Sequence, residues 1–81
     1  MIDDTTYFIG VYTKDGNFFQ LYTDKDKADA ENRYRQLKEE KDSIVIDGVP
    51  REDFLALSLN VQRYNKWGLL RGTECLNRIK F

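Results

Sequence analysis

The chain has 81 residues, of which 41% are hydrophobic and 14% aromatic, and its formal net charge is −1. A chain of this length forms one domain over residues 1–81 with a small core, because it buries only about 60–65% of its unfolded surface. The composition is too apolar for a disordered segment, and the absence of histidine excludes imidazole-based catalytic triads and the commonest metal ligand.

The first predicted element is a β-hairpin. Residues 6–13 and 17–23 are rich in β-branched and aromatic side chains, and Lys14-Asp15-Gly16 between them is typical of a hairpin turn. If Gly16 is the left-handed residue of a three-residue loop, the register of the two strands follows. The facing pairs are then Thr13 with Asn17, Val11 with Phe19, and Ile9 with Leu21. A two-residue turn at Asp15-Gly16 is the alternative, and it shifts the pairing by one residue.

A helix is predicted next. Asp24 can cap its start, and the helix runs to about Lys41. Acidic side chains in its first turns and lysines in its last turn complement the helix dipole. Its apolar stripe consists of Ala30, Tyr34 and Leu37. Because this stripe is thin, we expect the helix to lie on the sheet and to expose most of its circumference.

Two structures fit residues 50–68. A helix is indicated by Pro50 at its first position, acidic residues in its first turn and Gly68 just beyond its end. Its apolar stripe would comprise Phe54, Leu57, Val61 and Tyr64. A strand is indicated by the alternation of apolar and polar residues along 55–62. The apolar residues of that alternation are Leu55, Leu57, Leu59 and Val61. The helix is favoured because start, stop and stripe agree, and the strand remains the alternative.

The remaining segments complete the predicted fold. Residues 43–46 are predicted to form a short buried strand that ends at Asp47-Gly48, and residues 73–81 a last strand. On this last strand Cys75, Ile79 and Phe81 are predicted to face one side. The element order is therefore ββαβαβ. We expect an α+β, two-layer domain in which an N-terminal β-hairpin and two helices pack on a short, mainly antiparallel sheet.

The residues that carry common chemistries are missing or badly spaced. Cys75 is the only cysteine, so it cannot form an internal disulfide or a zinc site. We expect its side chain to be buried as a small hydrophobic residue. The acidic run 24–29 lacks the glycine and the glutamate of a calcium loop, and is better explained as a helix start. We therefore expect no enzyme, no catalytic residue, no metal and no cofactor.

The sequence also allows a prediction of the cellular compartment. Small secreted domains usually rely on several disulfides, so a single cysteine favours the cytoplasm. The residues Met1-Ile2-Asp3-Asp4 are acidic and lack the apolar segment of a signal peptide. The apolar runs are far shorter than the ~20 residues that a membrane helix needs, so we expect no membrane contact.

Charge is sorted along the chain. Residues 1–31 carry seven acids and three bases, whereas residues 54–81 carry five bases and one acid. Such asymmetry bears on partners and on the steering of association. In the C-terminal third the bases alternate with aromatic side chains, a pattern that can neutralise phosphates and stack on nucleobases.

A second candidate surface is the aromatic side of the predicted hairpin. Phe8, Tyr12, Phe18 and Tyr22 surround Gly10, and a two-layer domain with two helices leaves part of such a set exposed. Tyrosine and tryptophan carry much of the binding energy at protein interfaces. The alternative is that these aromatics are ordinary core or a homodimer contact.

The sequence therefore predicts a small non-enzymatic module that binds another protein, as an accessory subunit, regulator or inhibitor. The alternative is a nucleic-acid binding module that uses the basic-aromatic C-terminal third. The residues expected to carry binding are Tyr12, Phe18, Tyr22, Arg63, Lys66, Trp67 and Arg71.

Overall fold

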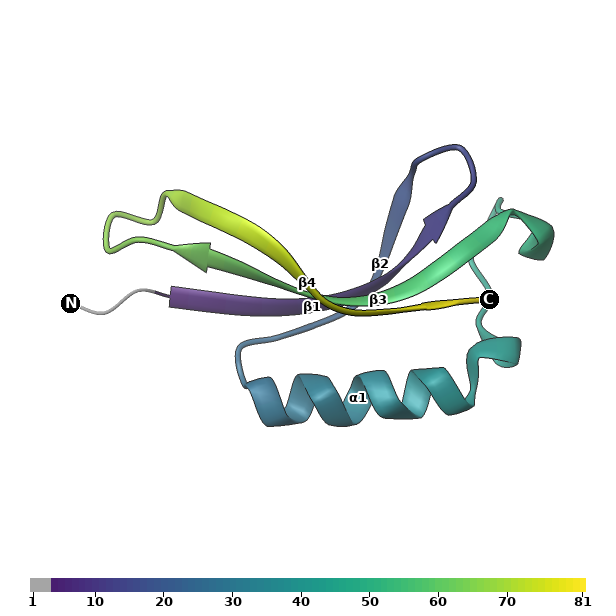
Figure 1. The fold of residues 1–81 in the computed structure, drawn as a ribbon, viewed down its shortest axis with the longest axis horizontal. Coiled ribbons are helices and arrows are strands. Elements are labelled where there is room, and N and C mark those ends of the chain that lie inside the picture. The colour runs from purple at the N-terminus through teal and green to yellow at the C-terminus, as the bar shows by residue number, and fades with distance from the viewer. Residues whose placement is uncertain (1–3) are drawn as a thin grey trace.

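A computed structural model describes residues 4–81 as a four-stranded antiparallel sheet with one α-helix against one of its faces (Figure 1). The strand order is β2-β1-β3-β4. The elements are β1 (Asp4–Thr13), β2 (Phe18–Asp24), α1 (Lys27–Glu39), β3 (Phe54–Tyr64) and β4 (Leu70–Lys80). Within these residues no helix is both long and apolar enough to cross a membrane. The expectation about a signal peptide falls mainly on Met1, Ile2 and Asp3, which lie outside the described residues.

The first hairpin forms with the predicted three-residue loop. The Thr13 amide donates to the Asn17 carbonyl at 3.0 Å, and Gly16 has a φ of +88°. The predicted pairing of Val11 with Phe19 is confirmed. A bulge between Ile9 and Gly10 then shifts the register, so Ile9 pairs with Tyr22 rather than with Leu21. The residues of the turn were therefore sufficient to predict the three-residue loop, but they did not predict the bulge.

Helix α1 begins two residues later than predicted. Its N-cap is Asp26, whose carboxylate accepts a hydrogen bond from the Asp29 amide at 3.0 Å. Asp24 instead accepts a hydrogen bond from the Asp26 amide at 2.9 Å, outside the helix. The predicted stripe is confirmed, because Ala30 and Tyr34 are buried and pack in the core of the sheet.

The predicted second helix is wrong, because residues 54–64 form the central strand β3. Every position of β3 from Ala56 to Val61 is buried, since β1 pairs along one edge and β4 along the other. Leu59, which the helix would have left outside its stripe, is 4% exposed in the core. Leu55 lies opposite an irregularity in the ladder and stays 45% exposed.

The signals that favoured a helix have other structural roles. Pro50 precedes a single 3-10 turn, Arg51–Asp53, which leads directly into β3. Gly68 has a φ of +78° and lies in the turn between β3 and β4, not at a helix end. Pro50 before acidic residues is therefore as compatible with a 3-10 turn as with a helix start. Gly68 is likewise as compatible with a hairpin turn as with a helix end.

The strand predicted at 43–46 is also absent. Lys41–Ser43 is a 3-10 turn, and Ile46 makes only an isolated bridge to Val49. Arg51 organises this segment, because its guanidinium donates to three carbonyl oxygens at 2.8–3.2 Å and stacks over two rings. The carbonyls belong to Lys41, Asp42 and Ile44, and the rings to Phe54 and Phe81.

Strand β4 confirms the predicted last strand and extends it at its start. A bulge opposite Leu59 and Asn60 makes Leu76 an extra residue, which changes the face of the residues before it. Ile79 and Phe81 pack against the core as predicted, but Cys75 is exposed rather than buried. The fold is thus mostly β with order ββαββ, which corrects the two-helix ββαβαβ prediction. With a single helix, the whole opposite face of the sheet has no helical cover (Figure 1).

Candidate interaction surfaces

The two hairpin turns have the same conformation. In the β1–β2 turn the Thr13 amide donates to the Asn17 carbonyl, and the Gly16 amide to the Thr13 carbonyl at 3.1 Å. In the β3–β4 turn Asn65, Gly68 and Leu69 make the equivalent bonds, both at 2.9 Å. The Asn65 side chain stabilises this second turn further, because its oxygen accepts from the amides of Trp67 and Leu69. Backbone and asparagine chemistry alone therefore account for its shape.

Trp67 occupies the position that Asp15 occupies in the first turn. Asp15 accepts hydrogen bonds from the side chains of Thr13 and Asn17, and the bond from the Thr13 hydroxyl lowers its pKa below the usual range. Trp67 makes no such contribution to its turn, and it is 72% exposed. Its ring is contacted by the Lys66 ammonium, 4.6 Å from the centroid.

Apolar exposure is concentrated around this tryptophan. Trp67, Leu69 (63% exposed) and Leu70 (54%) follow one another within four residues. The other large hydrophobics exposed in residues 4–81 are Val45, Leu55 and Leu76, which lie singly elsewhere. We call residues 65–70 the β3–β4 tip. It lies at the opposite end of the molecule from the C-terminus (Figure 1).

The helix-free face of the sheet, which we call the open face, carries an aromatic cluster. The Phe18 ring lies 5.6 Å from Phe8 and 4.8 Å from Tyr12, measured between centroids. The Arg78 guanidinium lies 4.7 Å from the Tyr12 centroid. Phe18 also covers Gly10, where a Cβ atom would lie 2.4 Å from the ring. The predicted grouping of three of these aromatics around Gly10 is therefore present.

Tyr22 does not join that cluster, because the bulge in β1–β2 places it beside the core under the helix. Its hydroxyl donates to the Asp24 carboxylate at 2.6 Å, which raises the pKa of Tyr22 and lowers that of Asp24. The Arg33 guanidinium lies 4.8 Å from its ring centroid. Tyr22 thus links β2 to α1 and is a packing residue.

The seven predicted binding residues therefore do not form one surface. Tyr12 and Phe18 lie on the open face near the start of β3, and Lys66 and Trp67 lie beyond its end. Eight residues of extended strand between these places span about 26 Å. Arg63 forms an exposed ion pair with Glu74 at 3.5 Å, and Arg71 is an extra residue at a second bulge in β4.

The charge sorted along the sequence is not sorted in the same way in space. Because β1 and β3 are antiparallel, Asp4 pairs with Tyr64 and Thr5 with Arg63. The acidic start of the chain thus lies beside the basic hairpin, and Asp4 itself is 3.5 Å from Lys25. A dipole running from one end of the molecule to the other, as the sequence suggested, does not arise from this pairing.

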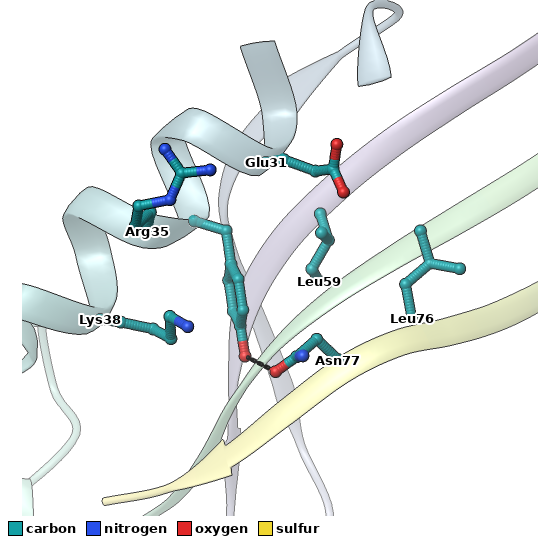
Figure 2. Close-up of a pocket in the computed structure, with 7 residues that line it drawn as sticks. Glu31, Arg35, Lys38, Leu59, Leu76 and Asn77 are labelled. Atoms are coloured by element: carbon teal, nitrogen blue, oxygen red, sulfur yellow. Dashed lines mark hydrogen bonds between the residues drawn. The ribbon is translucent and has the colours of Figure 1, made fainter. Parts of the chain in front are cut away.

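A small open cavity of about 200 Å³ lies between α1 and β4 (Figure 2). Charged side chains of the helix line one wall, and Leu59 and Leu76 lie across from them. The Tyr34 hydroxyl lies 2.9 Å from the Asn77 side-chain oxygen and 3.2 Å from the Leu57 carbonyl, both potential acceptors. Burial raises the pKa of Tyr34 to about 12. The cavity therefore lies beside the hydrogen bonds by which Tyr34 of α1 is joined to the sheet.

This pKa gives a testable dependence of stability on pH. The folded state retains the Tyr34 proton up to about pH 12, whereas the unfolded chain loses it near pH 10, so stability falls as pH rises through that window. The loss amounts to about 2–3 kcal/mol. Urea unfolding between about pH 9 and pH 12 should show it, and the Tyr34→Phe variant should lack it. Equal losses in both proteins would contradict the assignment, because the loss would then come from groups that both proteins share, such as Tyr22, whose pKa is also raised.

Sequence reasoning singled out Trp67 but missed Leu69 and Leu70 as its neighbours. The missing signal was the shared spacing of Thr13-Lys14-Asp15-Gly16 and Asn65-Lys66-Trp67-Gly68, which marks two turns of one type. In residues 4–81 the acids and the cysteine do not gather into a group that could hold a metal ion. Comparison of the chain with protein-family models, with curated proteins and with solved structures found no match.

Proposed function

We propose that the chain is a small cytoplasmic, non-enzymatic module that binds another protein through the β3–β4 tip, as an accessory subunit, regulator or inhibitor. The observation that carries this proposal is the exposure of Trp67, Leu69 and Leu70 in succession on a projecting turn. The exposed free thiol of Cys75 is compatible with a reducing compartment.

The energetics of the tip support a contact role. The first turn adopts the same conformation with Asp15 and Asn17 at the equivalent positions, so the fold does not require apolar side chains there. Contiguous exposed apolar area is costly in water and usually marks an interaction site. Tryptophan is the residue most enriched among those whose loss weakens protein interfaces by 2 kcal/mol or more, a change of about 30-fold in affinity.

The cations of the tip suit a partner with an acidic rim. Lys66 lies on the Trp67 ring, and Arg63 and Arg71 flank the base of the tip. We infer that Trp67 and the two leucines enter an apolar pocket of the partner while the cations meet its edge. Rim charges of this kind mainly accelerate association, so they contribute less to the lifetime of the complex.

The test is a double substitution that gives the second turn the side chains of the first, Trp67→Asp with Leu69→Asn. Because the C-terminus lies far from the tip (Figure 1), the protein is immobilised there for capture from a lysate. We expect the variant to capture at least about 30-fold less of a partner that the wild type retains, while its urea midpoint stays unchanged.

Val45→Asp is the matched control, because Val45 is 84% exposed and lies outside the tip. This variant should retain the same partner as the wild type. If the tip variant kept the partner, or if both variants lost it equally, binding would not depend on the tip.

A further inference from the structure

The registers of the three strand pairs define rows of residues that share the open face. From β2 through β1 and β3 to β4, the rows are Phe18-Tyr12-Ala56-Lys80, Gln20-Gly10-Ser58-Arg78 and Thr23-Phe8-Asn60-Cys75, followed by Thr6-Gln62-Thr73 without β2. Paired residues of neighbouring strands point to the same side of a sheet. The open face therefore has a definite composition, which differs from that of the chain as a whole.

None of these rows contains an acidic residue, although the chain has 14 acids. A further row of the same face, Asp4-Tyr64-Leu70, does contain an acid, and Asp4 lies 3.5 Å from the Lys25 ammonium. Glu74 pairs with the core residue Val61 and therefore lies on the helix side. The four rows named first contain Arg78 and Lys80 and no acid, so this part of the face is basic on a protein whose net charge is −1.

The aromatic and basic residues of the open face are arranged side by side. Phe8, Tyr12 and Phe18 lie on β1 and β2, and the two bases lie on β4. The strand between them contributes small, buried residues, namely Ala56, Ser58 and Asn60. Arg78 reaches across them to within 4.7 Å of the Tyr12 ring centroid. Exposed amides and hydroxyls surround the cluster, and they belong to Gln20, Thr23 and Thr73.

We infer that the open face binds single-stranded nucleic acid. Its cations can pair with phosphates, and the Tyr12 and Phe18 rings with the Arg78 plane offer stacking surfaces for bases. Amides and hydroxyls can donate to and accept from base edges. The four strands span about 15 Å across the face, so the contact covers only a few nucleotides and tolerates different sequences. The aromatic and basic residues of this site lie at the end of the open face away from the β3–β4 tip, so the site does not depend on the proposed protein partner.

Two cations predict a shallow dependence on salt. For single strands, the logarithm of the binding constant falls with the logarithm of salt concentration with a slope of about −0.7 for each neutralised phosphate. Arg78 and Lys80 together therefore give a slope of about −1.4. A fluorescein-labelled oligothymidylate of about 15 nucleotides, followed by anisotropy, measures this slope directly.

The variant Arg78→Gln with Lys80→Gln tests the cations. We expect at least about tenfold weaker binding at low salt and a slope close to zero. The control is Arg35→Gln with Lys38→Gln, which removes the same charge from α1 on the other side of the sheet. This control should bind within about twofold of the wild type, and an equal loss in both variants would overturn the proposal. Urea midpoints of both variants verify that they are folded.

Further binding measurements identify the kind of molecule that the open face binds. Tyr12→Leu should weaken oligothymidylate binding about fivefold or more without changing the salt slope, because it removes a stacking ring. Binding of a duplex or of polyglutamate as tight as that of the single strand would overturn the proposal, since neither offers unpaired bases. The tip variant Trp67→Asp with Leu69→Asn should bind the oligonucleotide normally. A loss there would place the strand on the tip instead, while failure of partner capture alone would leave the open face unaffected.

Discussion

Replacing Gly10 by alanine is expected to lower the free energy of unfolding by about 3 kcal/mol. A Cβ atom on Gly10 would lie 2.4 Å from the Phe18 Cζ atom and 2.4 Å from the Phe19 carbonyl oxygen. The ring can move, but the carbonyl belongs to the backbone of β2 and cannot move without disturbing the hairpin. For a chain of this size the loss is a large part of a total stability of about 4–12 kcal/mol.

Gly72→Ala is the matched control for this substitution. Gly72 lies in β4, and a Cβ atom there would meet nothing within 4 Å. Its replacement should be neutral or slightly stabilising, because alanine reduces the freedom of the unfolded chain. Combining Gly10→Ala with Phe18→Leu should recover only part of the loss, since the carbonyl contact remains. Urea unfolding of the four proteins measures these differences, and a stable Gly10→Ala protein would contradict the packing of Phe18 over β1.

Replacing Leu59 by alanine is expected to cost about 3 kcal/mol, and this result distinguishes the strand from the helix at residues 54–64. Leu59 is 4% exposed and packs in the core between the sheet and α1. Truncation removes buried methyl groups and enlarges the cavity beside Tyr34, so both hydrophobic transfer and lost packing contribute. In the helical alternative Leu59 lies outside the apolar stripe, and the same change would be mild.

Leu55→Ala on the same strand is the control, because Leu55 is 45% exposed. We expect a change within about 0.5 kcal/mol for this variant. Denaturant midpoints and m-values provide the comparison, since an unchanged m-value shows that the difference is one of stability. Similar costs at both positions would contradict the irregularity in the β1–β3 ladder that leaves Leu55 exposed.

The open face and the tip differ in how the fold creates them. The tip depends on one turn, so its side chains can change without loss of stability. The open face depends on the register of three strand pairs, and Phe18 there also packs over Gly10. Substitutions of the bases on β4 therefore probe its binding more cleanly than substitutions of its aromatics do.

Local chemistry made parts of this fold predictable. The Lys14-Asp15-Gly16 turn forms because glycine alone adopts the required φ easily, whatever the rest of the chain does. The stripe of Ala30 and Tyr34 packs on the sheet because a helix has a constant period of 3.6 residues. The sequence likewise indicated Trp67 as a candidate contact residue, although it did not predict that Trp67 lies on a turn.

Tertiary pairing accounts for the rest, since the local rules favour a helix at residues 50–68 and also permit a strand. Strand β3 forms because β1 and β4 pair along both of its edges and bury it on both faces. Strand β1 is distant from β3 in the sequence, so no local window contains both strands, whereas β4 follows β3 through a hairpin turn. The two bulges that move Tyr22 and Cys75 to other surroundings arise in the same way. A period of two assigns faces only within an unbroken ladder, and one extra residue reverses the assignment for all that follow.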